Sequence, residues 1–88
     1  MNNARRAEID KIVKALEDFD FEPHMEGLES VRDEEQEAFD NMPESLQSSD
    51  RGQASEAALE ALQEAYDAIE QARDSLQEAI SALERASE

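Results

Sequence analysis

Carboxylates spaced three or four residues apart are the side chains of this sequence that are best placed for chemistry. Examples are Asp33 with Glu37, Glu60 with Glu64, and Glu70 with Asp74. Such pairs hold metal ions in helical bundles when Glu-x-x-His motifs also point inward. The only histidine, His24, has Phe21 three residues before it, so the motif is absent. We interpret the pairs as a solvated charged face and expect neither a metal nor a cofactor.

Nucleophilic and phosphate-binding chemistry also lacks the residues that it needs. No base is spaced to activate Ser48, Ser49 or Ser55, and the sequence has neither a cysteine nor a glycine-rich phosphate loop. His24 lies among acidic residues, which favours a partly exposed histidine over a pH-sensing group. The sequence therefore predicts a protein that is not an enzyme.

The charge is strongly acidic and unevenly distributed. Asp and Glu number 24 against 8 Lys and Arg, for a formal net charge of −16. Residues 1–14 hold four basic and two acidic side chains, a net charge of +2, whereas residues 17–44 hold twelve acidic and one basic, a net charge of −11. Nucleic acids and anionic membranes repel such a chain. We expect a basic protein surface as its partner, and neither direct nucleic-acid binding nor membrane binding.

The length and hydropathy allow one small domain. A chain of 88 residues buries only a thin core. No apolar run approaches the roughly 20 residues of a membrane span, and residues 1–10 lack the apolar core of a signal peptide. We expect a single helical domain over residues 1–88 and a cytoplasmic location.

The elements that position these side chains are helices. From Ala58 to Leu83 the sequence repeats alanine followed by a large apolar residue in steps of three or four, which predicts a long helix over residues 51–86. Arg73 is the only charged residue in its apolar stripe. The expected core or oligomer face consists of Leu59, Leu62, Tyr66, Ile69, Leu76, Ile80 and Leu83.

The first half is predicted to be less regular. Apolar spacing indicates helices over residues 3–19 and 25–42, a break or kink over 20–27, and a turn over 43–50 with one helical turn after Pro43. Two alternatives remain for the interruption. Either Asp20 caps a new helix with Pro23 in its first turn, or one long helix kinks at Pro23.

A turn near residue 48 folds the two halves into an antiparallel hairpin. Leu16 then lies opposite Ile80, and Leu28 opposite Ile69. Arg73 falls opposite the interruption, so we expect a buried ion pair between Arg73 and Asp20, Glu22 or Glu26.

One hairpin does not cover the apolar surface that this pattern creates. The alanine stripe lies beside the stripe of large residues, so the apolar face is wide enough for two neighbouring helices. The predicted fold is therefore all-α, a hairpin with a broken or kinked first helix that pairs into a four-helix-bundle homodimer. A monomeric three-helix bundle is the alternative.

The acidic surface admits three interpretations. It keeps a helical oligomer soluble, it reflects a salt-adapted host, or it imitates the phosphates of a nucleic acid in a basic protein cleft. In the last case the partner-binding residues are Asp33, Glu34, Glu37, Asp40 and Glu44.

The segment from Arg32 to Gly52, which reads RDEEQEAFDNMPESLQSSDRG, resembles small acidic helical proteins of tailed bacteriophages and prophages. The likeness covers roughly residues 28–84 and is most distinctive from Ala38 to Gly52, while the interruption from Phe21 to Gly27 departs from it. The resemblance implies no functional residue. It does imply an inhibitor of a host defence system, such as an anti-CRISPR or anti-restriction protein, inside a bacterial cell.

We therefore predict a non-enzymatic, phage-type binding protein that acts through its acidic surface on a nucleic-acid-binding protein. The alternative is a structural or assembly coiled-coil protein that uses its apolar helix face.

Overall fold

The longest element is α4, a single uninterrupted helix from Asp50 to Ala86. The structure is a computed structural model that describes residues 1–88. Buried and half-buried residues recur along α4 in alternating steps of three and four, from Gly52 and Ser55 to Ile80 and Leu83. This is the seven-residue repeat of a coiled coil, and we call these positions, together with the buried and half-buried positions of residues 6–42 that face them, the seam. The seven residues that the sequence assigns to the core face all lie in the seam, and each is half-buried.

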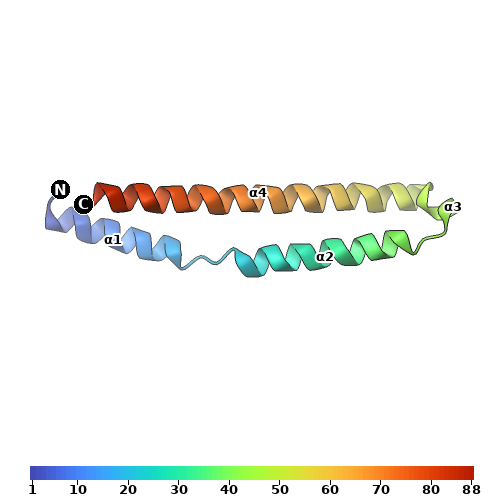
Figure 1. Cartoon of the computed structure of the whole chain (residues 1–88), viewed down its shortest axis with the longest axis horizontal. Coiled ribbons are helices and arrows are strands. Elements are labelled where there is room, and N and C mark those ends of the chain that lie inside the picture. The colour runs from blue at the N-terminus through green and yellow to red at the C-terminus, as the bar shows by residue number, and fades with distance from the viewer.

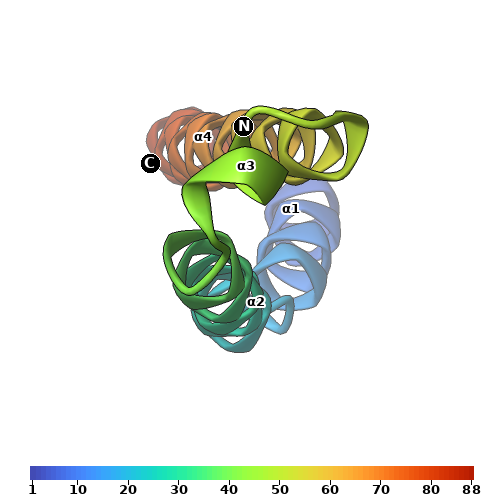
Figure 2. The same cartoon turned by 90° about the vertical axis from the view of Figure 1, so that its right-hand side faces the viewer.

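The other arm of the hairpin consists of α1, Asn3–Glu17, and α2, Glu22–Asp40, which follow one another along α4 (Figure 1). Both pack against α4, and the chain is therefore all-helical with an interrupted first half. Viewed end-on, the arms cross at a slant, as heptad-spaced helices do (Figure 2). The rod measures 68 × 16 × 13 Å.

The interruption is shorter than predicted and lies earlier in the chain. Helix α1 ends two residues before position 19, α2 begins at Glu22 rather than at residue 25, and α2 ends two residues before position 42. Pro23 lies in the first turn of α2, where its missing N–H is harmless. The Asp20 carboxylate accepts a hydrogen bond from the Glu22 backbone N–H at 3.1 Å. The chain therefore forms two separate helices with Pro23 in the first turn of the second, as in the first alternative, but the N-cap residue is Phe21, which makes no side-chain capping hydrogen bond.

The interruption has a geometric reason in the spacing of the seam. Buried and half-buried positions in the first arm alternate between steps of three and four, except for one step of five from Leu16 to Phe21. In a continuous helix the extra residue would rotate the apolar side by about 100° away from α4. By leaving the helix at Asp18 and re-entering it at Glu22, the chain returns both segments to the same partner.

A single-turn helix, α3 (Glu44–Gln47), makes the turn of the hairpin. Pro43 precedes it, as predicted for the 43–50 segment. Gly52 is buried against α3, and a Cβ atom at Gly52 would overlap the backbone carbonyl of Gln47. The side-chain amide of Gln47 donates to the carbonyl oxygens of Phe39 and Met42, at 3.1 and 3.2 Å. The corner therefore depends on a close backbone contact and on one glutamine.

The core between the arms is thin. Val13 and Met25 are the only buried hydrophobic residues, and no large side chain is fully buried. The accessible surface is 6429 Å². A typical folded monomer of this mass exposes about 5,200 Å², so the single chain exposes about 1,200 Å² more than expected.

Candidate interaction surfaces

Cross-hairpin contacts establish how the surfaces are arranged. Arg6 donates to the Ser87 carbonyl at 3.0 Å near the chain ends, and Arg32 donates to Gln63 at 2.7 Å further along the rod. Near the turn, the Ser55 hydroxyl donates to the Glu35 carboxylate at 2.6 Å. These contacts show that the first arm and α4 are antiparallel, close to the register that the sequence predicts.

The acidic face consists of Asp33, Glu34, Glu37 and Asp40 of α2, with Glu44 of α3. All five residues are exposed. Their spacing places the α2 members on the side of the helix opposite to the seam residues Leu28, Arg32 and Glu35. Gln36 donates to Asp40 at 2.9 Å and Arg32 lies 3.5 Å from Asp33, whereas the carboxylates of Glu34, Glu37 and Glu44 have no partner within the chain. Most of this face is therefore free to meet an external cation.

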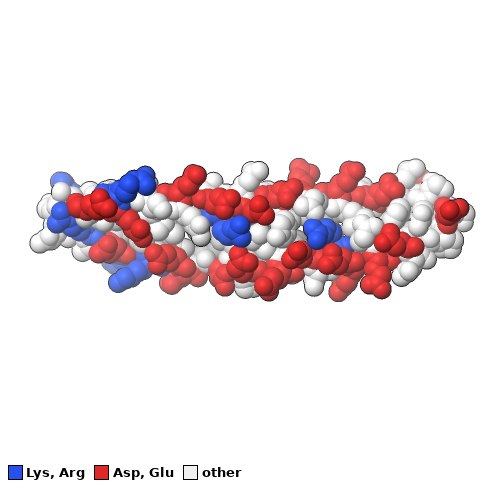
Figure 3. Space-filling view, in the orientation of Figure 1, with Lys and Arg blue, Asp and Glu red and all other residues white.

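Charge is separated along the length of the rod. Figure 3 shows most of the visible Lys and Arg at the end where α1 begins and further basic groups midway along the rod, while Asp and Glu lie in rows along both arms between neutral residues. Residues 1–14 have a net charge of +2 and residues 17–44 a net charge of −11. The molecule thus has a weakly charged end and a strongly acidic remainder.

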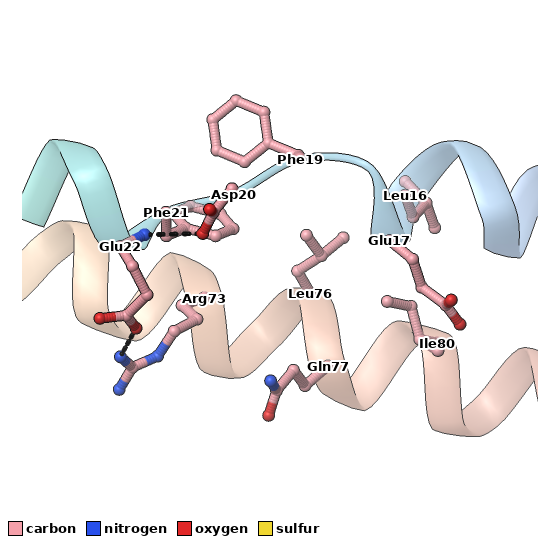
Figure 4. A pocket seen from close by; sticks show the side chains of 10 residues that line it. All are labelled: Leu16, Glu17, Phe19, Asp20, Phe21, Glu22, Arg73, Leu76, Gln77 and Ile80. Atoms are coloured by element: carbon pink, nitrogen blue, oxygen red, sulfur yellow. Dashed lines mark hydrogen bonds and ion pairs between the residues drawn. The ribbon is translucent and has the colours of Figure 1, made fainter.

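Arg73 contacts Glu22, one of the three carboxylates considered from the sequence, at 2.9 Å across the interruption (Figure 4). The expectation of a buried pair is wrong, because the side chains of Arg73 and Glu22 are 31% and 60% exposed. The hydrogen bond that Arg73 donates to the Glu22 carboxylate raises the pKa of Arg73, against a smaller lowering by desolvation. The pair is a surface contact that joins α4 to the first turn of α2.

A pocket of about 190 Å³ lies beside this pair, under the interruption. Leu16, Leu76 and Ile80 form its apolar part, and Arg73 lies at one side. Phe19 points away from α4, is 55% exposed, and stacks on His24 with ring centroids 6.0 Å apart. Phe19 and Phe21 complete the apolar lining, and the remaining polar lining consists of Glu17, Asp20, Glu22 and Gln77.

The alanine row is the second surface of interest. Along α4 from Ala54 to Ala86, an alanine recurs at steps of three or four residues, with Ser75 as the single exception. Each residue of this row directly precedes a buried or half-buried residue. Within the single chain all members except the half-buried Ala65 are exposed. The row therefore forms a side of the hairpin that the first arm does not cover.

The apolar residues left exposed on the first arm lie on the same side as the alanine row. A shallow groove there is lined by His24, Gly27 and Val31 of α2 and by Ile69 of α4. Arg32, which follows Val31, turns instead to Gln63 on the opposite flank. Phe19 joins the groove side through its stacking on His24. We call this combined surface the alanine side.

Two seam residues were not identified from the sequence. Gly52 and Ser55 are buried, yet neither is apolar enough to extend a hydrophobic pattern. The signal was present in the spacing, because steps of three and four continue backwards from Leu59 to both positions. Glu35, which interrupts the apolar pattern of the first half, is the partner of Ser55.

None of the four helices combines the length and hydropathy of a membrane span. The acidic side chains do not gather into any group of three that could hold a metal ion. Comparison with protein-family models, with curated proteins and with solved structures finds no match to this chain.

Proposed function

We propose that this protein is a non-enzymatic binding protein that acts through its acidic face on a basic cleft of a nucleic-acid-binding protein. The observation that carries the proposal is the row of exposed carboxylates on α2 and α3, most of which have no partner within the chain. A basic cleft would pair these groups and gain association rate from their long-range field.

The density of charge agrees with partial imitation of a nucleic acid. A net charge of −16 over a rod 68 Å long is about one charge per 4 Å. Duplex DNA carries one charge per roughly 1.7 Å of axis. The rod therefore presents a little under half the linear charge of DNA, enough to enter a phosphate-binding cleft but with a weaker dependence on salt than DNA.

Two finer parts of the proposal have narrower support. The resemblance of residues 28–84 to phage proteins makes the target a host defence protein, such as a CRISPR or restriction nuclease in the bacterial cytoplasm. This part rests on the resemblance alone. The homodimeric four-helix bundle is supported by the thin core and by the exposed alanine row.

The test is capture of bacterial lysate proteins on the immobilised chain at low and at high salt, followed by release with duplex DNA of mixed sequence. We expect nucleic-acid-binding proteins to be captured at low salt and released by DNA.

Reversing Asp33, Glu34, Glu37 and Asp40 to lysine should abolish capture. The matched control reverses Glu56, Glu60, Glu70 and Glu84 of α4, with the same change in net charge, and should retain most of it. Equal loss in both variants would show that only bulk charge matters.

An assembly protein is the alternative function, favoured by the exposed alanine row. Such a protein would tolerate reversal of the acidic face. It would lose its partner when Leu62 or Ile69 in the seam is changed to aspartate.

A further inference from the structure

We propose that the alanine side binds a second copy of this chain in antiparallel orientation, with α4 against α4 and the turn of one hairpin beside the chain ends of the other. This inference specifies the interface of the homodimer in the proposed function and rests on that part of it.

The amount of exposed surface indicates that a partner of this size is missing. The chain exposes about 1,200 Å² more than a typical monomer of its mass. Standard interfaces bury about 800 Å² on each partner, and obligate ones bury more. Covering one long side of the rod would bury an area close to this excess, and the alanine side is the apolar long side.

The alanine row pairs with itself when two copies of α4 run antiparallel. With a two-fold axis level with Glu70, Ala54 lies opposite Ala86 of the second copy, Ala61 opposite Ala79, and Ala68 opposite Ala72. Ser75 falls opposite Ala65, so every position of the row meets a small residue. Small side chains allow the helix axes to approach to the short end of the usual 8–10 Å range.

The same axis matches the exposed large residues of the first arm. Arg73 reaches Met25 at 3.7 Å, which places the middle of α4 level with the start of α2. Rotation about that level brings Phe19 of one copy beside Val31 of the other. These side chains are 55% and 49% exposed in the single chain. Each would then gain an apolar neighbour that its own hairpin does not supply.

Charge complementarity selects the antiparallel orientation. With Phe19 beside Val31, residues 1–14, net +2, lie beside residues 36–49 of the partner, which hold Glu37, Asp40 and Glu44 and no basic residue. A parallel pair would instead place residues 36–49 of the two copies side by side, with three carboxylates on each. Because the repulsion between exposed charges within about 8 Å is only partly screened at physiological salt, the antiparallel pair is favoured.

The first test measures the association state of the full chain by sedimentation equilibrium at micromolar concentration. We expect a dimer for the unmodified chain and a monomer for Ala68→Glu. The control Gln77→Glu adds the same charge on the opposite flank of α4 and should remain dimeric. Circular dichroism checks that both variants keep their helix content. A monomeric unmodified chain would overturn the inference, as would equal dissociation of the two variants.

The second test reads the orientation from disulfide formation, which is clean because the chain has no native cysteine. A mixture of Ala54→Cys and Ala86→Cys chains should form a mixed covalent dimer under mild oxidation. Ala54→Cys alone should not, since its two sulfurs would lie about 48 Å apart along the rod. In the control mixture of Glu60→Cys and Ser81→Cys the two positions also lie at nearly matching levels about the two-fold axis, but they face away from the interface, so the mixture should stay uncross-linked. Rapid cross-linking of Ala54→Cys to itself would contradict the antiparallel arrangement.

Failure here is distinguishable from failure of the acidic-face proposal. A monomer that still captures DNA-displaceable proteins would overturn the interface and leave the acidic face as the binding site. A dimer with the expected cross-links that captures no protein would support the interface and overturn the acidic-face proposal.

Discussion

Gly52 at the start of α4 lies so close to Gln47 of α3 that any side chain at position 52 would collide with the backbone carbonyl of Gln47. The contact joins the short helix of the turn to the long helix. Replacing the two glycines of this chain by alanine should therefore change the stability in opposite directions.

Gly52→Ala should destabilise the hairpin by about 1–3 kcal/mol, because the backbone of α3 must move to admit the methyl group. Gly27→Ala is the matched control. Gly27 lies in the interior of α2 with nothing within 4 Å of the added atom, so the variant should gain about 0.5–1 kcal/mol from helix propensity. Urea denaturation, at concentrations where both variants have the same association state, measures both values. Equal shifts of the same sign would show that the corner is looser than described.

Ser55→Ala should lower the free energy of unfolding by about 1–2 kcal/mol, since it removes the hydroxyl that donates to the half-buried Glu35 carboxylate. Ser75→Ala, the same substitution at an exposed position of the alanine row, should change it by less than about 0.5 kcal/mol.

The double variant Glu35→Leu with Ser55→Ala should recover the loss or exceed the stability of the unmodified chain, because an apolar pair replaces a polar one in the seam. If the double variant is less stable than Ser55→Ala alone, the polar pair stabilises more than packing at this level. Thermal unfolding followed by circular dichroism separates the two outcomes.

Arg73→Leu should raise the melting temperature. The substitution removes a surface ion pair, which contributes little, and completes the apolar seam between Ile69 and Leu76. Arg73→Glu should lower it, because a carboxylate would then face Glu22. A fall in helix content with Arg73→Leu would instead show that the contact with Glu22 organises the first turn of α2.

Added sodium chloride should raise the melting temperature of the unmodified chain. The net charge of −16 opposes folding and association, and salt screens this repulsion over a Debye length of about 8 Å at physiological ionic strength. Calorimetric scans at increasing ionic strength provide the measurement. A steady decrease would mean that attractive ion pairs, such as Arg73 with Glu22, dominate.

Much of the hairpin follows from the sequence because its signals are local and periodic. Alternation of alanine with large apolar residues predicts the long helix, and its predicted range of 51–86 differs from α4 by one residue at the N-terminal end. The bounds at the interruption were less predictable, because Asp18 to Phe21 contains no glycine or proline to mark where the chain leaves the helix. Pro23 suggested a later break, yet it is in fact part of the first turn of α2.

The surface sites were predictable to different degrees. The register follows from the position of the turn, so the sequence could place Arg73 near Glu22. It could not show that this pair lies at the surface, because that depends on how thin the core is along the whole rod. The close contact at Gly52 depends on how α3 folds back, which no periodicity encodes. Ser55 is too polar to extend an apolar pattern, so only the steps of three and four from Leu59 indicate its place in the seam.

The two ends of the polypeptide lie together at one end of the rod, where the guanidinium of Arg6 bonds to the carbonyls of Ser87 and Glu88 at 3.0 and 3.3 Å. A tag, label or bead attached to either end therefore sits about as far as the molecule allows from the α3 corner and from the carboxylates near it. In an antiparallel pair, two such attachments would point in opposite directions, so that a doubly tethered assembly could be pulled lengthwise from both sides.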